Sequence, residues 1–593
     1  MENHKIHSPF RRLRDYTVWE GREAKADRAD HTRYKKDRNN MCSVFGFQSR
    51  LELNGSVVSA ALKQMEYRGY DSCGIYLKNQ ILKGTYSVEE MSTQQGWASL
   101  NGSHGLGHTR WATNGSPTTV NAHPHTDKTG KVVVVHNGII SNAAKIKKQY
   151  NLKHESDTDT GVLVEFLANR YLRRHNKVHD VFDTILDCFN HIEGDYSFIA
   201  DFEGTVVAVN NGKPLIVGLD PYTCYAASDV LAFTDLTDQV IYLPYGSFYY
   251  LGQRKAYDSF GYNLEVEQEE ISKEFTSAYK EEYASFTEKE IMEQRQVIDQ
   301  PKNNINALRL EGKTYVVGSG SSFNAAAFST HLFNWIPIVA SEYKFNKIIK
   351  PGANVILISQ SGESQDVIDV AKDAKEKGCH LVGLLNIKNS SIGRLCDEVT
   401  EINCGPEVGV AATKSFTSQL ATILEVFGLK GFSDNFHWPN FCLENTAEKL
   451  AELEHIYVIG RGLHYPIARE AALKIKEMCY IHAEAIQGGE VKHGPLALLN
   501  EDSWAICLNP TDNTYEDTLK TISQLKARNI NVIGVSNKNN KLYDKFIKIK
   551  ESRDIVYALA EIFPLQILAY EMARRRNIDP DRPRNLAKSV TVE

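Results

Sequence analysis

A cysteine that directly follows a methionine, Cys42 after Met41, is the first residue whose position could carry chemistry. An internal cysteine is usually a small buried hydrophobic residue. If Met41 were the initiator and were removed, Cys42 would carry both a thiol and a free α-amine. The amine, with a reference pKa of about 8, would act as general base toward the thiol near neutral pH. We therefore expect residues 1–41 to be absent from the active protein, through initiation at Met41 or by processing.

Polar groups suited to binding a free amino acid follow in four short segments. They are "HTRWATNGSP" from His108, "NAHPH" from Asn121, "VHNGII" from Val135 and "SDTDTG" from Ser156. An arginine clamps a carboxylate with two hydrogen bonds, and an aspartate accepts an ammonium. An asparagine side chain and the N–H of the following glycine stabilise an oxyanion. Together these groups fit hydrolysis of the side-chain amide of glutamine.

A serine-rich turn, "SQSGES" at 359–364, lies between the apolar stretch 355–358 and an apolar-periodic helix. Hydroxyls and backbone N–H groups at a helix N-terminus bind a phosphate dianion, although such a turn can also be only a helix cap. A second hydroxyl-rich turn, at 319–322, favours the interpretation that the two turns bind a phosphate. No Walker lysine follows, so a sugar phosphate is expected rather than a nucleotide. The G-x-G turns at 318–320 and 460–462 lack the third glycine of a dinucleotide site.

A third group of reactive residues lies near the C-terminus. Glu470, Lys474 and Glu477 are spaced i, i+4 and i+7, on one helix face, and "YIHAEAIQGGEVKHGP" with His493 follows. An exposed Glu–Lys pair is the simpler interpretation of such spacing, but the added imidazoles and carboxylates suit proton transfer at a carbonyl carbon. Lys588 would form a Schiff base only if the tail folded back into a desolvated site, which spacing does not reveal.

Two kinds of architecture must position these residues. From 41 to about 275, β-branched and aromatic runs between Gly and Asn turns indicate sheets with a few helices. From 276 to 300 the sequence is charged and helical, and it is interpreted as a connector. Beyond it, "TYVVGSGSSFNAAAF" and "IYVIGRGLHYPIARE" repeat one pattern of strand, turn and helix. Two similar subdomains with parallel sheets are therefore expected.

Composition limits the class of protein. The 593 residues are too many for one hydrophobic core, and the net charge of -6 does not favour nucleic acid or a membrane surface as partner. The first forty residues contain eleven Lys or Arg and seven Asp or Glu, and they lack the apolar core of a secretory signal. No run of eighteen apolar residues occurs, so no membrane span is expected. Ten scattered cysteines without zinc spacing indicate a reducing cytoplasm and no structural metal.

From Cys42 to Glu593 the chain resembles the glutamine:fructose-6-phosphate aminotransferases, or glucosamine-6-phosphate synthases. The matching segments, in chain order, are "YRGYDS", "HTRWAT", "NAHPH", "HNGII", "SQSGES", "GVAATKSFT", "EAALKIKE", "YIHAEA", "KHGPLAL" and "PRNLAKSVTVE". The resemblance implies an αββα N-terminal-nucleophile glutaminase at 42–275, and two sugar isomerase (SIS) subdomains of α/β type at 301–445 and 446–593.

The resemblance also implies a role for each matched residue. In the glutaminase, Cys42 is the nucleophile, Asn137 and Gly138 form the oxyanion hole, and the glutamine-binding residues are Arg110, Trp111, Thr113 and Asp159. In the synthase half, Glu477, His493 and Lys588 are catalytic, and the sugar phosphate is bound by Ser321, Ser322, Ser359, Gln360, Ser361, Ser364, Val410, Glu470, Lys474 and Ala587.

The implied reaction converts L-glutamine and D-fructose 6-phosphate to L-glutamate and D-glucosamine 6-phosphate, the first step of hexosamine synthesis. His493 opens the sugar ring, Lys588 forms an imine with the ketose, and Glu477 moves a proton between C1 and C2. No metal or organic cofactor is implied, and the family is homodimeric, with the ring-opening histidine supplied by the neighbouring subunit.

Three positions depart from the family pattern. Ser43 and Val44 replace Gly and Ile, Asn114 replaces His, and Ala412 replaces Ser. The first two departures lie beside the glutamine pocket. Two alternatives therefore stay open: an ammonia-dependent synthase or phosphosugar isomerase with a silent glutaminase, and a non-catalytic sugar-phosphate sensor.

Overall fold

The computed structural model describes residues 42–111, 115–174, 180–233, 235–271, 283–299, 310–426, 441–586 and 588. Residues 1–41, Thr113, Asn114 and Ala587, about which the sequence makes predictions, lie outside this part.

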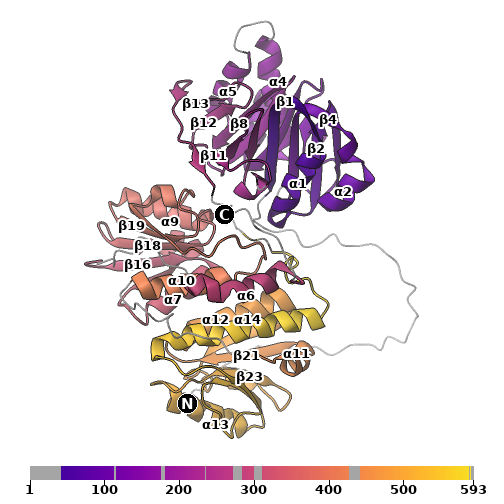
Figure 1. Cartoon of the computed structure of the whole chain (residues 1–593). Coiled ribbons are helices and arrows are strands. Elements are labelled where there is room, and N and C mark those ends of the chain that lie inside the picture. The colour runs from indigo at the N-terminus through magenta and orange to yellow at the C-terminus, as the bar shows by residue number, and fades with distance from the viewer. Residues whose placement is uncertain are drawn as a thin grey trace, which may run out of the picture. The chain divides into compact units, whose positions relative to one another are not determined.

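The N-terminal half contains two antiparallel sheets stacked between helices (Figure 1). The order of the first is β15-β11-β9-β10-β1-β4-β2-β3. Its strands are β1 (Ser43–Asn54), β2 (Ser72–Leu77), β3 (Gln80–Gly84), β4 (Asn101–Arg110), β9 (Ile216–Leu219), β10 (Thr223–Ala227), β11 (Gln239–Tyr242) and β15 (Glu269–Glu270). Helices α1 (Ser56–Met65) and α2 (Val88–Gln94) cover its outer face.

The order of the second sheet is β14-β13-β12-β8-β7-β6-β5. Its strands are β5 (His125–Thr126), β6 (Val132–Gly138), β7 (Tyr196–Phe202), β8 (Thr205–Asn211), β12 (Ser247–Tyr250), β13 (Lys255–Asp258) and β14 (Asn263–Leu264). Helices α3 (Ala143–Gln149), α4 (Asp159–Arg174) and α5 (Asp180–His191) accompany it.

The run of four valines at 132–135 shows why this half forms layers. Side chains alternate along a strand, so Val132 and Val134 pack against the helices, whereas Val133 and Val135 pack between the two sheets. Both faces of β6 are therefore buried, which requires an unbroken apolar run. The resulting αββα order is the one that the sequence resemblance implies.

The C-terminal half contains two five-stranded parallel sheets, β17-β16-β18-β19-β20 and β22-β21-β23-β24-β25. The first comprises β16 (Thr314–Gly318), β17 (Ile336–Val339), β18 (Asn354–Ser359), β19 (His380–Leu385) and β20 (Glu398–Glu401); the second comprises β21 (His455–Gly460), β22 (His482–Gln487), β23 (Trp504–Leu508), β24 (Asn531–Ser536) and β25 (Lys545–Lys548). The parallel α/β subdomains predicted from the repeat are confirmed.

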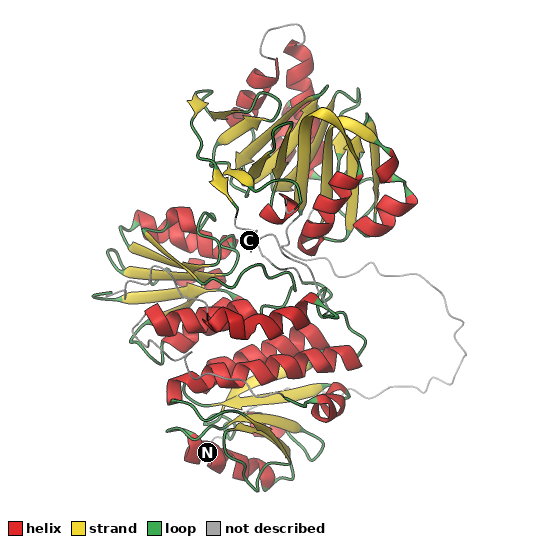
Figure 2. Cartoon of the chain, in the orientation of Figure 1, coloured by secondary structure: helices red, strands yellow, loops and turns green. Residues whose placement is uncertain are grey.

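Helices pack the two subdomains around a shared apolar core (Figure 2). They are α6 (Phe286–Asp299), α7 (Gly320–Ser329), α8 (Tyr343–Asn346), α9 (Gln365–Glu376), α10 (Lys414–Val426), α11 (Glu444–Ala451), α12 (His464–Cys479), α13 (Tyr515–Lys526) and α14 (Tyr557–Arg575). Within the described part, only the segment Asp554–Arg575 is long and apolar enough for a membrane span, and 83% of its apolar window is buried. That burial is typical of a core helix.

Candidate active sites for glutamine and sugar phosphate

The Cys42 side chain lies beside the end of β4. Strand β1 pairs with β4, Ser43 opposite Thr109, and this register brings the thiol to Trp111. The Trp111 N–H donates to Sγ at 3.4 Å, and the thiol donates to the Trp111 carbonyl oxygen at 3.5 Å. Burial raises the pKa of the Cys42 thiol to about 11, and the nearby Arg110 charge only partly opposes this effect. The thiol is therefore protonated at neutral pH and needs a base before it can attack.

Arg110 and Asp159 lie close enough to Cys42 for their charges to act on its thiol. Arg110 is buried, and its guanidinium donates to the carbonyl oxygens of Gly115 at 3.1 Å and Ser116 at 3.3 Å. Asp159 begins α4 and accepts the Ile140 N–H at 2.9 Å. A cation suited to bind a carboxylate, Arg110, and an anion suited to bind an ammonium, Asp159, thus both lie near the Cys42 thiol.

Asn137 and Gly138 end β6, and both lie in the register of β6 against β7. Gly138 has φ +108°, and a Cβ there would lie 2.2 Å from the Asp195 carbonyl oxygen. Only glycine fits both the backbone conformation and the space. The sequence pair Asn-Gly therefore keeps a backbone N–H and an amide side chain together at the strand end, as an oxyanion hole requires.

A cluster of mostly buried histidines lies next to Asn137 of β6. Its members are His108, His123, His125, His136 and His154. Successive rings of His108, His123, His125 and His154 have centroids 4.0, 4.7 and 5.2 Å apart. Burial lowers the pKa of all five, to about 3 for His108. These rings are neutral at pH 7. Within the described residues, no group of His, Cys, Asp or Glu is arranged to hold a metal ion.

The serine-rich turn joins β18 to α9, as the sequence predicts. Ser359 Oγ accepts the Gly362 N–H at 3.0 Å, and Ser361 Oγ accepts the Glu363 N–H at 3.1 Å. Ser364 is the N-cap of α9 and its side chain caps no N–H there. The interpretation of this turn as only a helix cap therefore does not hold for the Ser364 hydroxyl.

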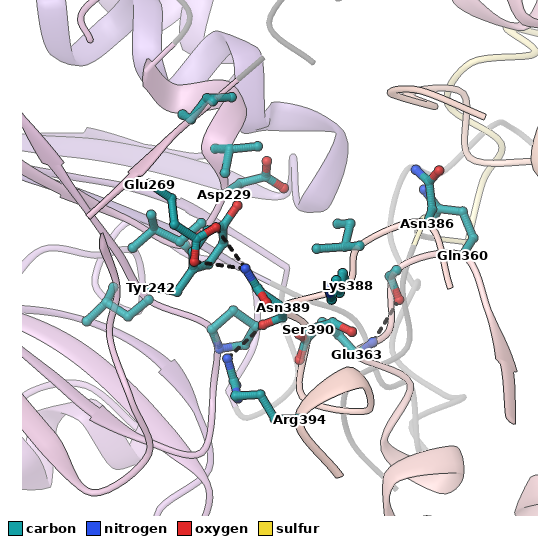
Figure 3. A pocket seen from close by; sticks show the side chains of 18 of the residues that line it. Asp229, Tyr242, Glu269, Gln360, Glu363, Asn386, Lys388, Asn389, Ser390 and Arg394 are labelled. Carbon is teal, nitrogen blue, oxygen red and sulfur yellow. Dashed lines mark hydrogen bonds between the residues drawn. The ribbon is translucent and has the colours of Figure 1, made fainter. Parts of the chain in front are cut away.

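The second hydroxyl turn begins α7 beside this loop. Ser322 Oγ accepts from Gln419 of α10 at 3.0 Å. Gln360 and Ser361 line a cavity of about 320 Å³, whose lining also includes Glu363, Asn386 and Ser390 (Figure 3). Hydroxyls and amides of the serine-rich turn and of residues 386–390 thus line one partly open cavity, which suits a phosphate ester.

A buried ionic group on α12 is formed by Glu470, Lys474 and Glu477. The simpler interpretation of these residues as an exposed Glu–Lys pair is therefore wrong. The Lys474 ammonium lies 3.3 Å from Glu470 and 2.6 Å from Glu477. Ser321 donates to Glu470 at 2.8 Å and accepts from Lys474 at 3.3 Å. The lysine side chain is fully buried, whereas that of Glu477 is 20% exposed. Glu477 is thus the carboxylate of the group that a ligand can reach.

The C-terminal tail does fold back onto the first SIS subdomain. Asp581 accepts the N–H groups of Phe286 and Thr287, 2.9 and 2.7 Å away, at the start of α6, and its carbonyl accepts the Val410 N–H at 3.2 Å. Beyond it, the Lys588 side chain is only 4% exposed and pairs with Glu407. Lys588 lines the same cavity as Gln360 and Ser361. The desolvated environment that a Schiff-base lysine needs is present.

The described contacts do not join the His493 side chain to these groups. It is exposed, and within the described residues no hydrogen bond or ion pair joins its side chain to Glu477 or Lys588.

Three residues that contact the predicted site residues were not predicted from the sequence. Glu407 contacts Lys588, Gln419 contacts Ser322, and Asn324 donates to Glu470 at 2.8 Å. Glu407 lies two positions before "GVAATKSFT" in the sequence, but its contact with Lys588 depends on a tail that is 181 residues away.

In the second SIS subdomain, the position that corresponds to Ser322 of the first subdomain is occupied by a buried histidine in an ion group. Tyr315 pairs with Val355 in the first sheet, and Tyr457 pairs with Ala505 in the second. This register aligns Ser322 with His464. The His464 ring, fully buried, lies 2.7 Å from Asp512 and 2.8 Å from Glu561. Burial favours the neutral ring, but the two carboxylates prevail and raise its pKa to about 10.

Comparisons with known proteins agree with both halves. The chain matches the glutamine amidotransferase domain over residues 108–235 and the SIS domain over residues 307–427 and 449–574. A solved structure, the C-terminal domain of glucosamine-fructose-6-phosphate aminotransferase from Francisella tularensis, is 27% identical, with a TM-score of 0.45, and covers 52% of this chain and 100% of that chain.

Curated relatives extend this match to nearly the whole chain. The glutamine–fructose-6-phosphate aminotransferase (isomerizing) of Thermococcus kodakarensis is 34% identical over 608 residues, and that of Pyrococcus horikoshii is 35% identical over 608 residues. Each alignment covers 93% of this chain and 100% of the relative. The resemblance found in the sequence is confirmed: the chain belongs to the glutamine–fructose-6-phosphate aminotransferase (isomerizing) family.

Proposed function

We propose that this enzyme transfers the amide nitrogen of L-glutamine to D-fructose 6-phosphate and releases D-glucosamine 6-phosphate and L-glutamate. The observation that carries the proposal is the return of the C-terminal tail, which brings Lys588 into a cavity with Gln360 and Ser361. A Schiff base requires a desolvated lysine amine beside the sugar, whereas binding of a sugar phosphate alone does not. The same chain carries the Cys42 pocket that would supply the nitrogen.

In the glutaminase, the Cys42 thiol attacks the glutamine carboxamide, and the Asn137 amide and Gly138 N–H stabilise the oxyanion. Arg110 holds the carboxylate of glutamine, and Asp159 holds its α-ammonium. The charged residues that act on the thiol are Arg110, Asp71 and Asp159. Burial raises the pKa of the thiol to about 11, so the attack needs a general base. The α-amine of a terminal Cys42 is therefore the proposed base, with residues 1–41 removed.

In the synthase half, the serines of the two turns and Gln360 hold the phosphate. Lys588 condenses with C2 of the open-chain ketose, and Glu477 moves a proton between C1 and C2. Lys474 lies 2.6 Å from Glu477 and forms an ion pair with its carboxylate. His493 opens the ring.

The exposed position of His493 supports a homodimer in which it acts in the neighbouring subunit's site. Within one chain, the described residues show no hydrogen bond or ion pair between His493 and Glu477 or Lys588. In the proposed homodimer, the exposed histidine would be supplied by the neighbouring copy. A cytoplasmic location fits the ten cysteines, all of which are free.

The test uses protein that begins at Cys42, with product measured from glutamine and, separately, from ammonium. Cys42→Ala is expected to abolish glutamine-dependent product and to retain ammonia-dependent product. Lys588→Ala is expected to abolish both and to retain sugar-phosphate binding. Unchanged turnover in Lys588→Ala would remove this lysine from the mechanism. Binding of fructose 6-phosphate without product from either nitrogen source would instead identify a sugar-phosphate sensor.

A further inference from the structure

Glu407 is the closest charged partner of Lys588. It lies in the loop between β20 and α10, its side chain is fully buried, and it accepts a hydrogen bond from the Lys588 ammonium. A second Lys588 N–H reaches the Gly409 carbonyl oxygen at 2.7 Å. Glu407 and Lys588 both line the cavity that is also lined by Gln360 and Ser361. The reacting nitrogen therefore faces a single carboxylate in a water-poor site.

The surroundings keep Glu407 ionised. Its Oε1 accepts the N–H groups of Thr413 and Ser415 at 2.9 and 3.0 Å, at the start of α10, and its Oε2 accepts from the Ser415 hydroxyl at 2.6 Å. Burial alone would favour the neutral acid, but the Lys588 charge and these donors lower the pKa of Glu407 to about 2. A carboxylate held so firmly as an anion is a poor proton acceptor.

A second buried carboxyl group close to Lys588 belongs to helix α6. Glu290 of α6 accepts the Gly409 N–H at 3.1 Å, and burial together with the Glu407 charge raises the pKa of Glu290 to about 8. It is mostly neutral at pH 7. The nearby Lys414 ammonium has its own partner, Glu293, at 2.5 Å. One anion thus faces one cation at the reacting nitrogen.

Imine formation leaves the net charge at the nitrogen unchanged, so such an anion is compatible with it. One ammonium proton passes to the carbonyl oxygen as the freed amine attacks the ketone carbon, and loss of water then leaves a C=N bond in place of the C=O bond. The carbonyl oxygen leaves as water with two of the three ammonium protons. One proton and the single positive charge stay on nitrogen. No net proton enters or leaves, so a permanently ionised partner can stabilise the nitrogen before and after condensation.

We propose that Glu407 is a catalytic residue of the synthase reaction, the counter-ion that pairs with the Lys588 nitrogen first as an ammonium and then as the protonated imine of the sugar. A protonated imine is far more electrophilic than a neutral one, so the carboxylate stabilises the form that ammonia attacks. This inference rests on the proposed function, because it assumes that Lys588 condenses with the ketose.

The test compares Glu407→Gln, Glu407→Asp and the parent enzyme in ammonia-dependent product formation, across pH 6 to 9. Borohydride reduction with intact mass measures the sugar adduct on Lys588. Loss of an electrostatic partner of this kind costs on the order of 100-fold in turnover. Glu407→Gln is expected to fall by about that factor, to lose most of the trapped adduct and to lose activity at a lower pH than the parent. Glu407→Asp, which keeps the charge, should retain about tenfold more activity than Glu407→Gln.

Glu293→Gln is the matched control, because it removes the carboxylate partner of a neighbouring buried lysine without touching Lys588. It should stay within about threefold of the parent, a range that corresponds to under 1 kcal/mol in barrier height. Glutamine hydrolysis and fructose 6-phosphate binding report whether each variant is folded. Glu407→Gln at parental activity, or Glu407→Asp no better than Glu407→Gln, would overturn the inference and leave the proposed function intact. No product and no adduct from the parent enzyme would overturn both.

Discussion

Removal of the His464 ring should destabilise the second SIS subdomain strongly. His464 begins α12 and links it to Glu561 of α14 and to Asp512 at the end of β23. All three side chains are fully buried. In His464→Ala, two buried carboxylates lose their shared cation, and one of them must become protonated or the segment must open.

The size of the effect follows from the burial. Loss of one member of a buried ion pair costs about 3–5 kcal/mol. At roughly 2–4 °C for each kcal/mol in a unit of this size, the melting temperature of the synthase half should fall by about 6–20 °C. His464→Gln keeps a polar side chain without the charge, and it should fall between the parent and His464→Ala. A surface pair offers the control: His380, 39% exposed, lies 3.2 Å from Glu398, and His380→Ala should change stability by less than about 1 kcal/mol.

Thermal unfolding followed by fluorescence, with glutamine hydrolysis measured in parallel, separates the synthase half from the glutaminase. The folded pKa of His464, about 10, exceeds the ordinary value of 6.5. The folded state therefore binds the extra proton, so this contribution is complete below pH 6.5 and is lost as pH rises through 10. The difference in melting temperature between parent and His464→Ala should shrink accordingly toward alkaline pH. A His464→Ala protein that melts within 2 °C of the parent at pH 7 would refute the reasoning.

Three further results are expected. Gly138→Ala would place a methyl group 2.2 Å from a backbone oxygen at φ +108°, so glutamine hydrolysis should be lost while ammonia-dependent synthesis persists; equal loss of both would contradict this. The histidine cluster is neutral when folded, because burial lowers each pKa below 6.5, so the unfolded chain binds more protons and stability should decline as pH falls from 6.5 toward 3. A glutaminase melting temperature that is constant from pH 7 to pH 4 would argue against that. Lys474→Met should abolish ammonia-dependent turnover and lower the melting temperature, and Lys474→Met with Glu470→Gln should recover stability but not turnover. Turnover in either variant would exclude Lys474 from the chemistry.

The sequence predicts the sheets well because strand and helix patterns are local properties. Runs of β-branched and aromatic residues indicate the sheets of the first half, whose αββα layering is implied only by the family resemblance. The repeat of strand, G-x-G turn and helix predicts the paired parallel sheets of the second half. The serine-rich turn at 359–364 falls between strand and helix as expected, since apolar strand and amphipathic helix enclose it.

What the sequence could not show is which distant residues meet. Spacing places Glu470, Lys474 and Glu477 on one face but does not distinguish an exposed pair from a buried group, because that depends on Ser321 and Asn324 of another helix. The environment of Lys588 depends on Glu407, far away in the chain. Long-range pairing of this kind leaves no periodic signal.

The most direct measurement of the proposed function traces the nitrogen atom. Glutamine labelled with ¹⁵N at its side-chain amide, with unlabelled fructose 6-phosphate, is incubated with purified protein whose N-terminus is defined by intact mass. We predict that protein beginning at Cys42 forms ¹⁵N-labelled glucosamine 6-phosphate together with an equal amount of glutamate. Product formed only from added ammonium by protein that begins at Cys42, with no label from glutamine, would contradict the proposed function.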